Sequence, residues 1–189
     1  SFMSTIAYIH DKTEKIVRKA ASRDPFEICR SMQIRVHYKD LGTVLKAYYF
    51  YQSRIRNIVI NSRSGMTVRR ILCAHELGHA VLHGELAAMR GFQELELFDR
   101  SAPAEYEANL FAAELLISDE ELLPLLNDRD KSFFSIAKEL YVPAELLDFK
   151  FRLLKTRGLR MESPLTSPAD FLKKELPECF EPEYSFEGA

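Results

Sequence analysis

Residues 67–83, TVRRILCAHELGHAVLH, constrain the fold more than any other segment, because their apolar and histidine positions recur at helical spacing. The positions on one broad face are Val68, Ile71, Leu72, His75, His79 and Leu82. This pattern predicts an amphipathic helix with Thr67 as its N-cap and Gly84 as the stop just past its end.

The same helix carries His75 and His79 four residues apart, so both imidazoles lie on one face and can bind one metal ion. Glu76 is rotated from that line by one residue, where it can act as general base on a water at the metal without binding the metal itself. Unpaired imidazoles in so apolar a helix would be costly, which argues against two ordinary buried histidines. We therefore expect a metal site with His75 and His79 as ligands and Glu76 as the catalytic residue.

A catalytic zinc site needs a third protein ligand besides an open position, and His83 is the obvious candidate. It follows His79 by four residues, but each such step moves about 6 Å along a helix axis. Three successive turns cannot converge on one ion. We expect His83 to support the ligands by hydrogen bonding or packing.

The segment PAEYEANLFAAELL, residues 103–116, offers three carboxylates as the third ligand. Glu105 is favoured because Asn109, four residues later, lies on the same face and can orient a ligand histidine. Glu107 points about 160–200° away from Glu105 around the helix, and it remains the alternative ligand. Glu114 is expected to be solvated or to cap the helix.

Three β-rich stretches precede the histidine helix, at residues 34–38, 47–52 and 56–61. β-branched and aromatic residues dominate them, and short polar connections separate them, which predicts a small antiparallel three-stranded sheet. Helical patterns cover residues 4–22, 24–32, 103–117, 118–127 and 132–158, the last divided near Pro143. Helices, a small sheet and further helices in this order predict an α+β fold.

Charge and cysteine content exclude several function classes. The net charge of −2 over 189 residues gives no general electrostatic case for nucleic-acid or membrane partners. No apolar run approaches the roughly 20 residues that span a bilayer, and the N-terminus lacks a secretory pattern. The three cysteines are far apart and form no C-x-x-C pair, which fits a reducing cytoplasm. We expect a cytoplasmic protein whose metal is held by histidine and carboxylate.

Two segments together resemble the ImmA/IrrE family of zinc metallo-endopeptidases: INSRSGMTVRRILCAHELGHAVLHGE and EYEANLFAAELLIS. The upstream DPFEICRSMQIRV and the downstream IAKELYVPAELLDFKFRLL are also similar to that family, so the resemblance covers roughly residues 15–157. Ser118 stands where the family usually has proline, a change at a helix junction.

The resemblance implies a minimal zincin-like core of the gluzincin type, with His75, His79 and Glu105 as zinc ligands and Glu76 as base. It also implies a protein substrate, a helix-turn-helix repressor encoded nearby, and a role in regulating mobile elements. Asn109 and His83 would then be hydrogen-bond partners of the ligand histidines. Histidine and carboxylate suit zinc, although manganese or iron could occupy the same ligands.

The expected organisation is a metallopeptidase domain at 3–128, a helical pair resembling a helix-turn-helix at 129–158 packed on it, and a tail at 159–189 with at most a short helix near 168–176. Two alternatives to the enzyme stay open. One is a partner that binds a repressor or toxin without cutting it. The other is a DNA-binding module, since Arg152, Lys155, Arg157 and Arg160 make the end of the helical pair basic.

Overall fold

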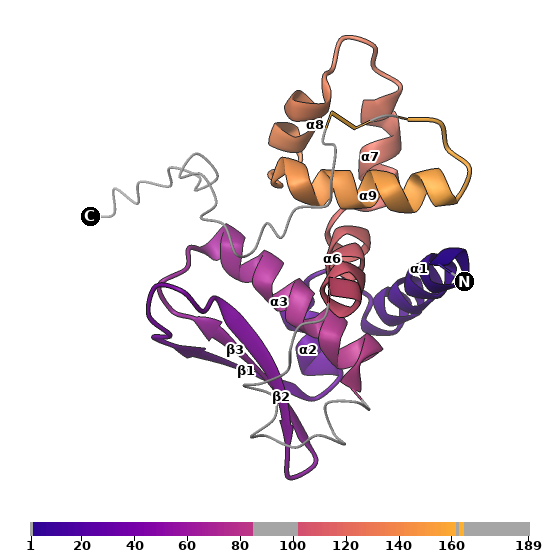
Figure 1. The fold of residues 1–189 in the computed structure, drawn as a ribbon. Coiled ribbons are helices and arrows are strands. Elements are labelled where there is room, and N and C mark those ends of the chain that lie inside the picture. The colour runs from indigo at the N-terminus through magenta and orange to yellow at the C-terminus, as the bar shows by residue number, and fades with distance from the viewer. Residues whose placement is uncertain (1, 85–101, 162, 165–189) are drawn as a thin grey trace.

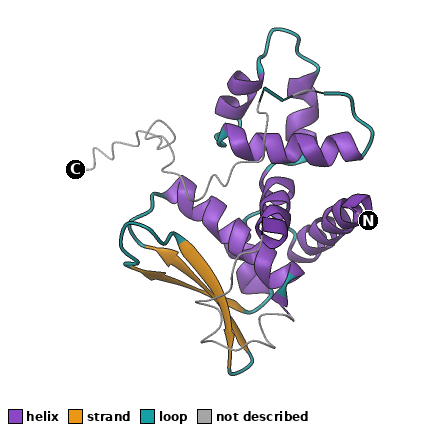
Figure 2. Ribbon diagram, viewed as in Figure 1, coloured by secondary structure: helices purple, strands orange, loops and turns teal. Residues whose placement is uncertain are grey.

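The structure, a computed structural model, describes residues 2–84, 102–161, 163 and 164 (Figure 1). Within these residues the chain forms a three-stranded sheet and seven helices, and the helices lie mostly on one side of the sheet (Figure 2). The elements in chain order are α1 (Phe2–Ala20), α2 (Pro25–Ser31), β1 (Ile34–Lys39), β2 (Ala47–Gln52), β3 (Ile55–Asn61), α3 (Met66–Leu82), α6 (Ala102–Leu116), α7 (Asp119–Leu126), α8 (Phe133–Glu139) and α9 (Ala144–Thr156). The α+β class is confirmed, and the short helix expected near 168–176 lies outside the described residues.

The sheet is mixed, with the strand order β1-β3-β2. β2 and β3 pair antiparallel as predicted, but β1 pairs with β3 in parallel, with Ile34 opposite Arg56. The predicted antiparallel sheet is therefore wrong for the β1–β3 pair. The reason is burial: residues 57–61 of β3 are all buried, so β3 takes the central position and the two less buried strands flank it.

Asn61, the last residue of β3, holds the segment that connects the two flanking strands, β1 and β2. Its Nδ2 donates to the carbonyl oxygens of Gly42 at 2.8 Å and Leu45 at 2.9 Å. Both acceptors belong to the connection between β1 and β2. Ser53 and Arg54 then form the β2–β3 turn with φ of 51° and 63°, the left-handed pair typical of a two-residue hairpin.

Helix α3 packs on β2 and β3, and α6 crosses it closely (Figure 1). A Cβ on Gly78 would lie 3.2 Å from the Ala108 backbone and 3.1 Å from Cδ1 of Phe111, so glycine allows this approach without displacing α6. The predicted N-cap of α3 is wrong, because the N-cap is Gly65 rather than Thr67. The helix ends at Leu82 with His83 as C-cap, so Gly84 follows the end as predicted, but it does not adopt the positive φ of a left-handed stop.

The helices after α6 begin and end at signals carried by their own residues. The Oγ of Ser118 accepts from the backbone N–H of Glu121 at 3.2 Å, as the first turn of α7 requires. The predicted break between α8 and α9 is confirmed, with Tyr141 at φ of 55° and Pro143 as N-cap of α9. Gly158 follows α9 with φ of 95°.

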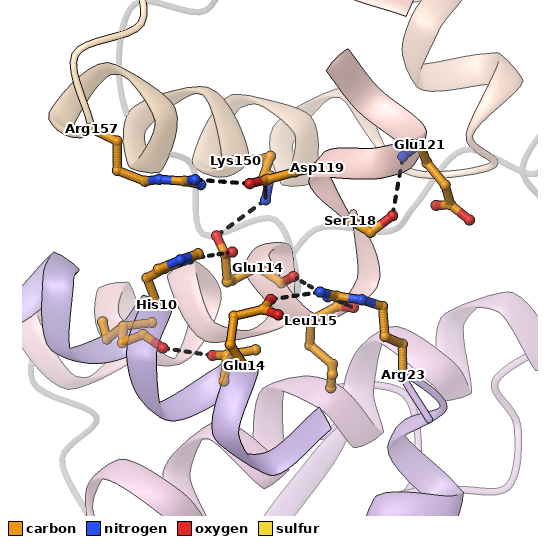
Figure 3. A network of polar contacts seen from close by, with 12 residues as sticks. His10, Glu14, Arg23, Glu114, Leu115, Ser118, Asp119, Glu121, Lys150 and Arg157 are labelled. Atoms are coloured by element: carbon orange, nitrogen blue, oxygen red, sulfur yellow. Dashed lines mark hydrogen bonds and ion pairs between the residues drawn. The ribbon is translucent and has the colours of Figure 1, made fainter. Parts of the chain in front are cut away.

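A buried ionic network joins α1, α6, α7 and α9 (Figure 3). Lys150 is 0 % exposed, and its Nζ donates to Oε2 of Glu114 at 3.2 Å and to Oδ1 of Asp119 at 2.7 Å. His10 Nδ1 lies 2.8 Å from the other carboxylate oxygen of Glu114. Glu114 is 1 % exposed, so its predicted solvated or capping position is wrong.

Among the described helices, none is both long and apolar enough to cross a membrane.

Candidate metal centre

Helices α3 and α6 bring two histidines and one carboxylate together in the interior. His75 and His79 project from α3, and Glu105 projects from the first turn of α6. The Nε2 atom of His75 lies 3.1 Å from Oε2 of Glu105, and the Nε2 atom of His79 lies 3.0 Å from Oε1. These ligand atoms lie within 4.8 Å of one another, and the three residues are 0 %, 5 % and 7 % exposed. This buried group fits a metal site.

His75 presents the atom that a metal ion requires. The Oδ1 of Asn109, one turn beyond Glu105 on α6, lies 2.8 Å from Nδ1 of His75 and accepts a hydrogen bond from its N–H. The lone pair of the neutral ring therefore lies on Nε2, which is buried and has no hydrogen-bond partner among the described residues. Nε2 faces an acceptor oxygen of Glu105. A cation bound between these two acceptors removes their repulsion, so the donor set fits a divalent metal.

The surroundings of His79 favour its neutral form. Burial lowers the pKa of His79 below its ordinary value, and the hydrogen bond that Glu105 accepts from Nε2, which favours the protonated ring, does not offset this effect. A neutral imidazole is the form that binds metals. His79 is therefore suited to bind a cation without first losing a proton.

His83 and Glu107 extend the group on its outer side. The Nδ1 of His83 lies 3.0 Å from Nδ1 of His79, and the Nε2 of His83 lies 3.1 Å from Oε2 of Glu107. His83 thus touches a proposed ligand without joining the cluster of ligand atoms. Glu107 contacts α3 too, one turn farther along than Glu105. Helical angles alone place the two glutamates on opposite sides of α6, and the crossing of the two helices brings both within reach of α3.

Glu76 is buried beside the histidines. It is 1 % exposed, and its carboxylate partly opposes the lowering of the His79 pKa that burial causes. The structure therefore places a carboxylate next to the cluster on the ligand helix itself.

The tyrosines near the site have different surroundings. Tyr106 follows Glu105 in α6 but packs against Phe149 of α9, with ring centroids 5.7 Å apart. Tyr49 of β2 is buried, and its hydroxyl has no hydrogen-bond partner among the described residues. Burial raises the pKa of Tyr49 to about 12, so it stays protonated at neutral pH.

Comparison with known proteins supports the geometry. Residues 29–152 match the family model of the IrrE N-terminal-like domain, peptidase family M78. The chain is 34 % identical over 137 residues to "Uncharacterized immunity region protein 2" of Bacillus phage phi105, covering 72 % of this chain and 85 % of that protein. It is 26 % identical over 158 residues to "Metallopeptidase ImmA" of Bacillus subtilis strain 168, covering 82 % and 90 %.

These matches span the strands, both helices of the His75–His79–Glu105 group and most of α9, so the resemblance noted in the sequence is confirmed. The chain belongs to the IrrE N-terminal-like family of metallopeptidases, with distant homology to metallopeptidase ImmA.

Proposed function

We propose that this protein is a zinc-dependent endopeptidase that cleaves a helix-turn-helix transcriptional repressor. The observation that carries the proposal is the convergence of His75, His79 and Glu105, with buried nitrogen and oxygen acceptors within 4.8 Å of one another. Two imidazoles and one carboxylate are a ligand set of catalytic zinc sites. The ligand helix on a sheet, crossed by the helix that supplies the carboxylate, supports a zincin-like core of the gluzincin type.

In this proposal His75, His79 and Glu105 hold the metal, and Asn109 and His83 orient the two imidazoles. Bound zinc would supply Lewis acidity, which lowers the pKa of water and polarises the scissile carbonyl. Glu76 accepts the proton of the attacking water and then donates it to the leaving amine. Burial of Glu76 beside His79 supports this role, because it places a proton acceptor next to the ligand set.

The substrate and setting are proposed from the relatives. One relative is named as an immunity region protein of a Bacillus phage and another as a metallopeptidase. A peptidase related to both suits the removal of a repressor that controls a mobile element, in the cytoplasm, where the repressor acts. The repressor to test first is one encoded beside this gene.

We also propose that residues 3–128 form the peptidase domain and that 129–158 pack on it as a structural helical pair. The contact of Tyr106 with Phe149 and the burial of Lys150 against Glu114 support this organisation. Two of the four basic residues that suggested DNA binding form ion pairs, Arg152 with Asp148 and Arg157 with Asp119. Their charges are therefore partly neutralised within the fold.

The test is co-expression of the full chain with the neighbouring repressor, followed by mass spectrometry of the repressor and zinc analysis of the purified chain. We expect cleavage and about one zinc per chain for the wild type. Glu76→Gln should retain zinc and lose cleavage by a factor of about 10²–10⁴. Glu105→Ala should lose both, whereas the matched control Glu120→Gln, at an exposed position of α7, should change neither.

Two results would contradict this proposal in different ways. Cleavage that survives Glu76→Gln would remove Glu76 from the mechanism. Zinc retained by a wild type that leaves the repressor intact would favour the non-cleaving partner, and binding of the intact repressor in a pull-down would then identify it.

A further inference from the structure

A hydrogen-bonded chain leads from the metal centre to the protein surface. It runs from Nε2 of His79 through its Nδ1 to Nδ1 of His83 at 3.0 Å, and from Nε2 of His83 to Oε2 of Glu107 at 3.1 Å. The exposed fraction of the side chain rises along it, from 6 % for His79 to 12 % for His83 and 31 % for Glu107. Either Nδ1 atom, that of His79 or that of His83, could donate the hydrogen bond between them. Which one carries the proton therefore depends on the groups at the two ends of the chain.

The carboxylate of Glu107 at the outer end and a cation bound at the inner end together determine the positions of the protons. An ionised carboxylate can only accept hydrogen bonds, so Nε2 of His83 must carry a proton towards Glu107. In a neutral ring, Nδ1 of His83 is then an acceptor. Because two acceptors cannot share a hydrogen bond, Nδ1 of His79 must be the donor. In the structure Nε2 of His79 lies 3.0 Å from Oε1 of Glu105. A cation that takes the place of the proton between these two atoms leaves the lone pair of His79 on Nε2, and every contact of the chain then has one donor and one acceptor.

His75 reaches the same state by a different route. Its Nδ1 donates to the amide oxygen of Asn109, a neutral acceptor 4 % exposed. The two ligand histidines therefore carry matching tautomers, one set by a buried amide and the other by a carboxylate acting through an intervening imidazole. A carboxylate polarises an imidazole more strongly than an amide does, which increases the basicity of the ligand nitrogen.

We propose that Glu107 and His83 are positioning residues that set the tautomer of His79 and raise its affinity for the metal. This inference rests on the proposed metal centre and assigns Glu107 a role distinct from that of Glu105. Glu107 does not bind the metal; it determines which nitrogen of His79 does. Without Glu107, His83 can turn its Nδ1–H towards His79, and the lone pair of His79 would then point away from the metal.

The experiment measures zinc and cobalt binding by the chelator-treated full chain. Zinc affinity is obtained by competition with a chromophoric chelator, and the visible absorption of bound Co²⁺ reports the ligand field at the site. The variants are Glu107→Ala, His83→Ala, His83→Asn and the double variant His83→Asn/Glu107→Ala. Glu120→Ala, which removes an exposed carboxylate of α7, is the matched control.

We expect His83→Ala to weaken zinc binding about 10- to 100-fold and Glu107→Ala about tenfold or less, with a shifted Co²⁺ spectrum in both. His83→Asn places an amide oxygen near the position of the ring Nδ1, which reproduces the arrangement of Asn109 at His75. It should therefore restore most of the affinity lost in His83→Ala. In the His83→Asn background, Glu107→Ala should not weaken zinc binding further, because the amide of Asn cannot pass the influence of the Glu107 carboxylate on to His79.

Thermal unfolding of the metal-free variants separates positioning from folding, since the proposal predicts weaker metal binding at an unchanged midpoint. Equal zinc affinities and Co²⁺ spectra for wild type, Glu107→Ala and His83→Ala would overturn the inference while leaving the metal centre intact. An undiminished effect of Glu107→Ala in the His83→Asn background would also overturn it, because the carboxylate would then act directly through space. A wild type that binds neither ion would instead overturn the metal centre itself, and the inference with it.

Discussion

His75 and Asn109 are joined across two helices by a hydrogen bond of 2.8 Å between Nδ1 and Oδ1. Asn109 follows Glu105 by one turn of α6, so a single helix supplies both a carboxylate to the metal centre and an acceptor to one of its histidines. Both Asn109 and His75 are buried. Water therefore cannot easily replace the amide oxygen if it is removed.

Asn109→Ala should consequently weaken zinc binding about 10- to 100-fold, because His75 loses the acceptor that fixes its ring. Asn109→Asp keeps an acceptor oxygen at the same position and should therefore bind zinc more tightly than Asn109→Ala does. Competition titration against a chelator gives both affinities. Asn127→Ala, at the end of α7, is the control, and an equal loss in Asn109→Asp and Asn109→Ala would contradict the orienting role.

Gly78 controls how closely α6 approaches α3. In Gly78→Ala the new Cβ would lie 3.1 Å from Cδ1 of Phe111 and 3.2 Å from the Ala108 backbone, so α6 would have to shift by a few tenths of an ångström. We expect a loss of about 1–3 kcal/mol in the free energy of unfolding, despite a gain of up to about 1 kcal/mol in helix propensity. Urea denaturation of the metal-free chain measures the difference.

Gly84→Ala is the control for Gly78, since its Cβ would meet only the Tyr49 hydroxyl at an ordinary 3.8 Å. It should be neutral or nearly so. If Gly78→Ala were as stable as Gly84→Ala, the close contact between the helices would not be needed.

Most helices of this fold could be predicted because their signals are local. The Asp24 side chain accepts from the backbone N–H of Phe26, and Ser118 caps α7, as their residue types suggest. The i, i+4 spacing of His75 and His79 is equally local. The strand pairing could not be predicted from local signals, because β1 and β2 are consecutive in sequence whereas β3 lies between them in the sheet. The uninterrupted apolar run of β3 was the available signal of a central strand.

The surroundings of the carboxylates depended on contacts between distant residues. Glu114 is the one charged residue in the otherwise apolar run 110–117 and would be expected to reach solvent if it had no partner. Its partner Lys150 is 36 residues away in sequence. Glu107 likewise meets His83 only because α6 crosses α3, and sequence spacing within one helix carries no information about a crossing.

Asp119 should make the fold sensitive to acid. Burial tends to raise its pKa, but hydrogen bonds from Arg157 and Lys150 outweigh that effect and lower the pKa from 3.8 to about 2. A lowered pKa in the folded state means that the ionised form adds stability above pH 3.8, and that this stability is lost as the pH falls towards 2. Asp119→Asn should therefore be less stable than the wild type at pH 7, with the gap closing between these two values.

Chemical denaturation across that pH range tests the sign. Asp130→Asn, at an exposed position between α7 and α8, should show no comparable gap. A difference between wild type and Asp119→Asn that widened on acidification would contradict the assignment.

Lys150 should stabilise the fold chiefly by neutralising the buried carboxylate of Glu114, since its other partner, Asp119, also pairs with Arg157. The side chains of Lys150 and Glu114 are almost fully buried, with exposures of 0 % and 1 %. Lys150→Met removes the cation and leaves a buried carboxylate that still contacts Nδ1 of His10, which should lower the free energy of unfolding by about 3–5 kcal/mol.

The double variant Lys150→Met/Glu114→Gln removes both charges at nearly constant volume, and it should recover at least half of that loss, because an uncompensated charge costs more than an absent pair. Urea denaturation of the two single variants and the double variant gives the coupling between the sites. Additive losses would show that Lys150 stabilises the junction of α6 and α9 through the packing of its aliphatic chain rather than through its charge.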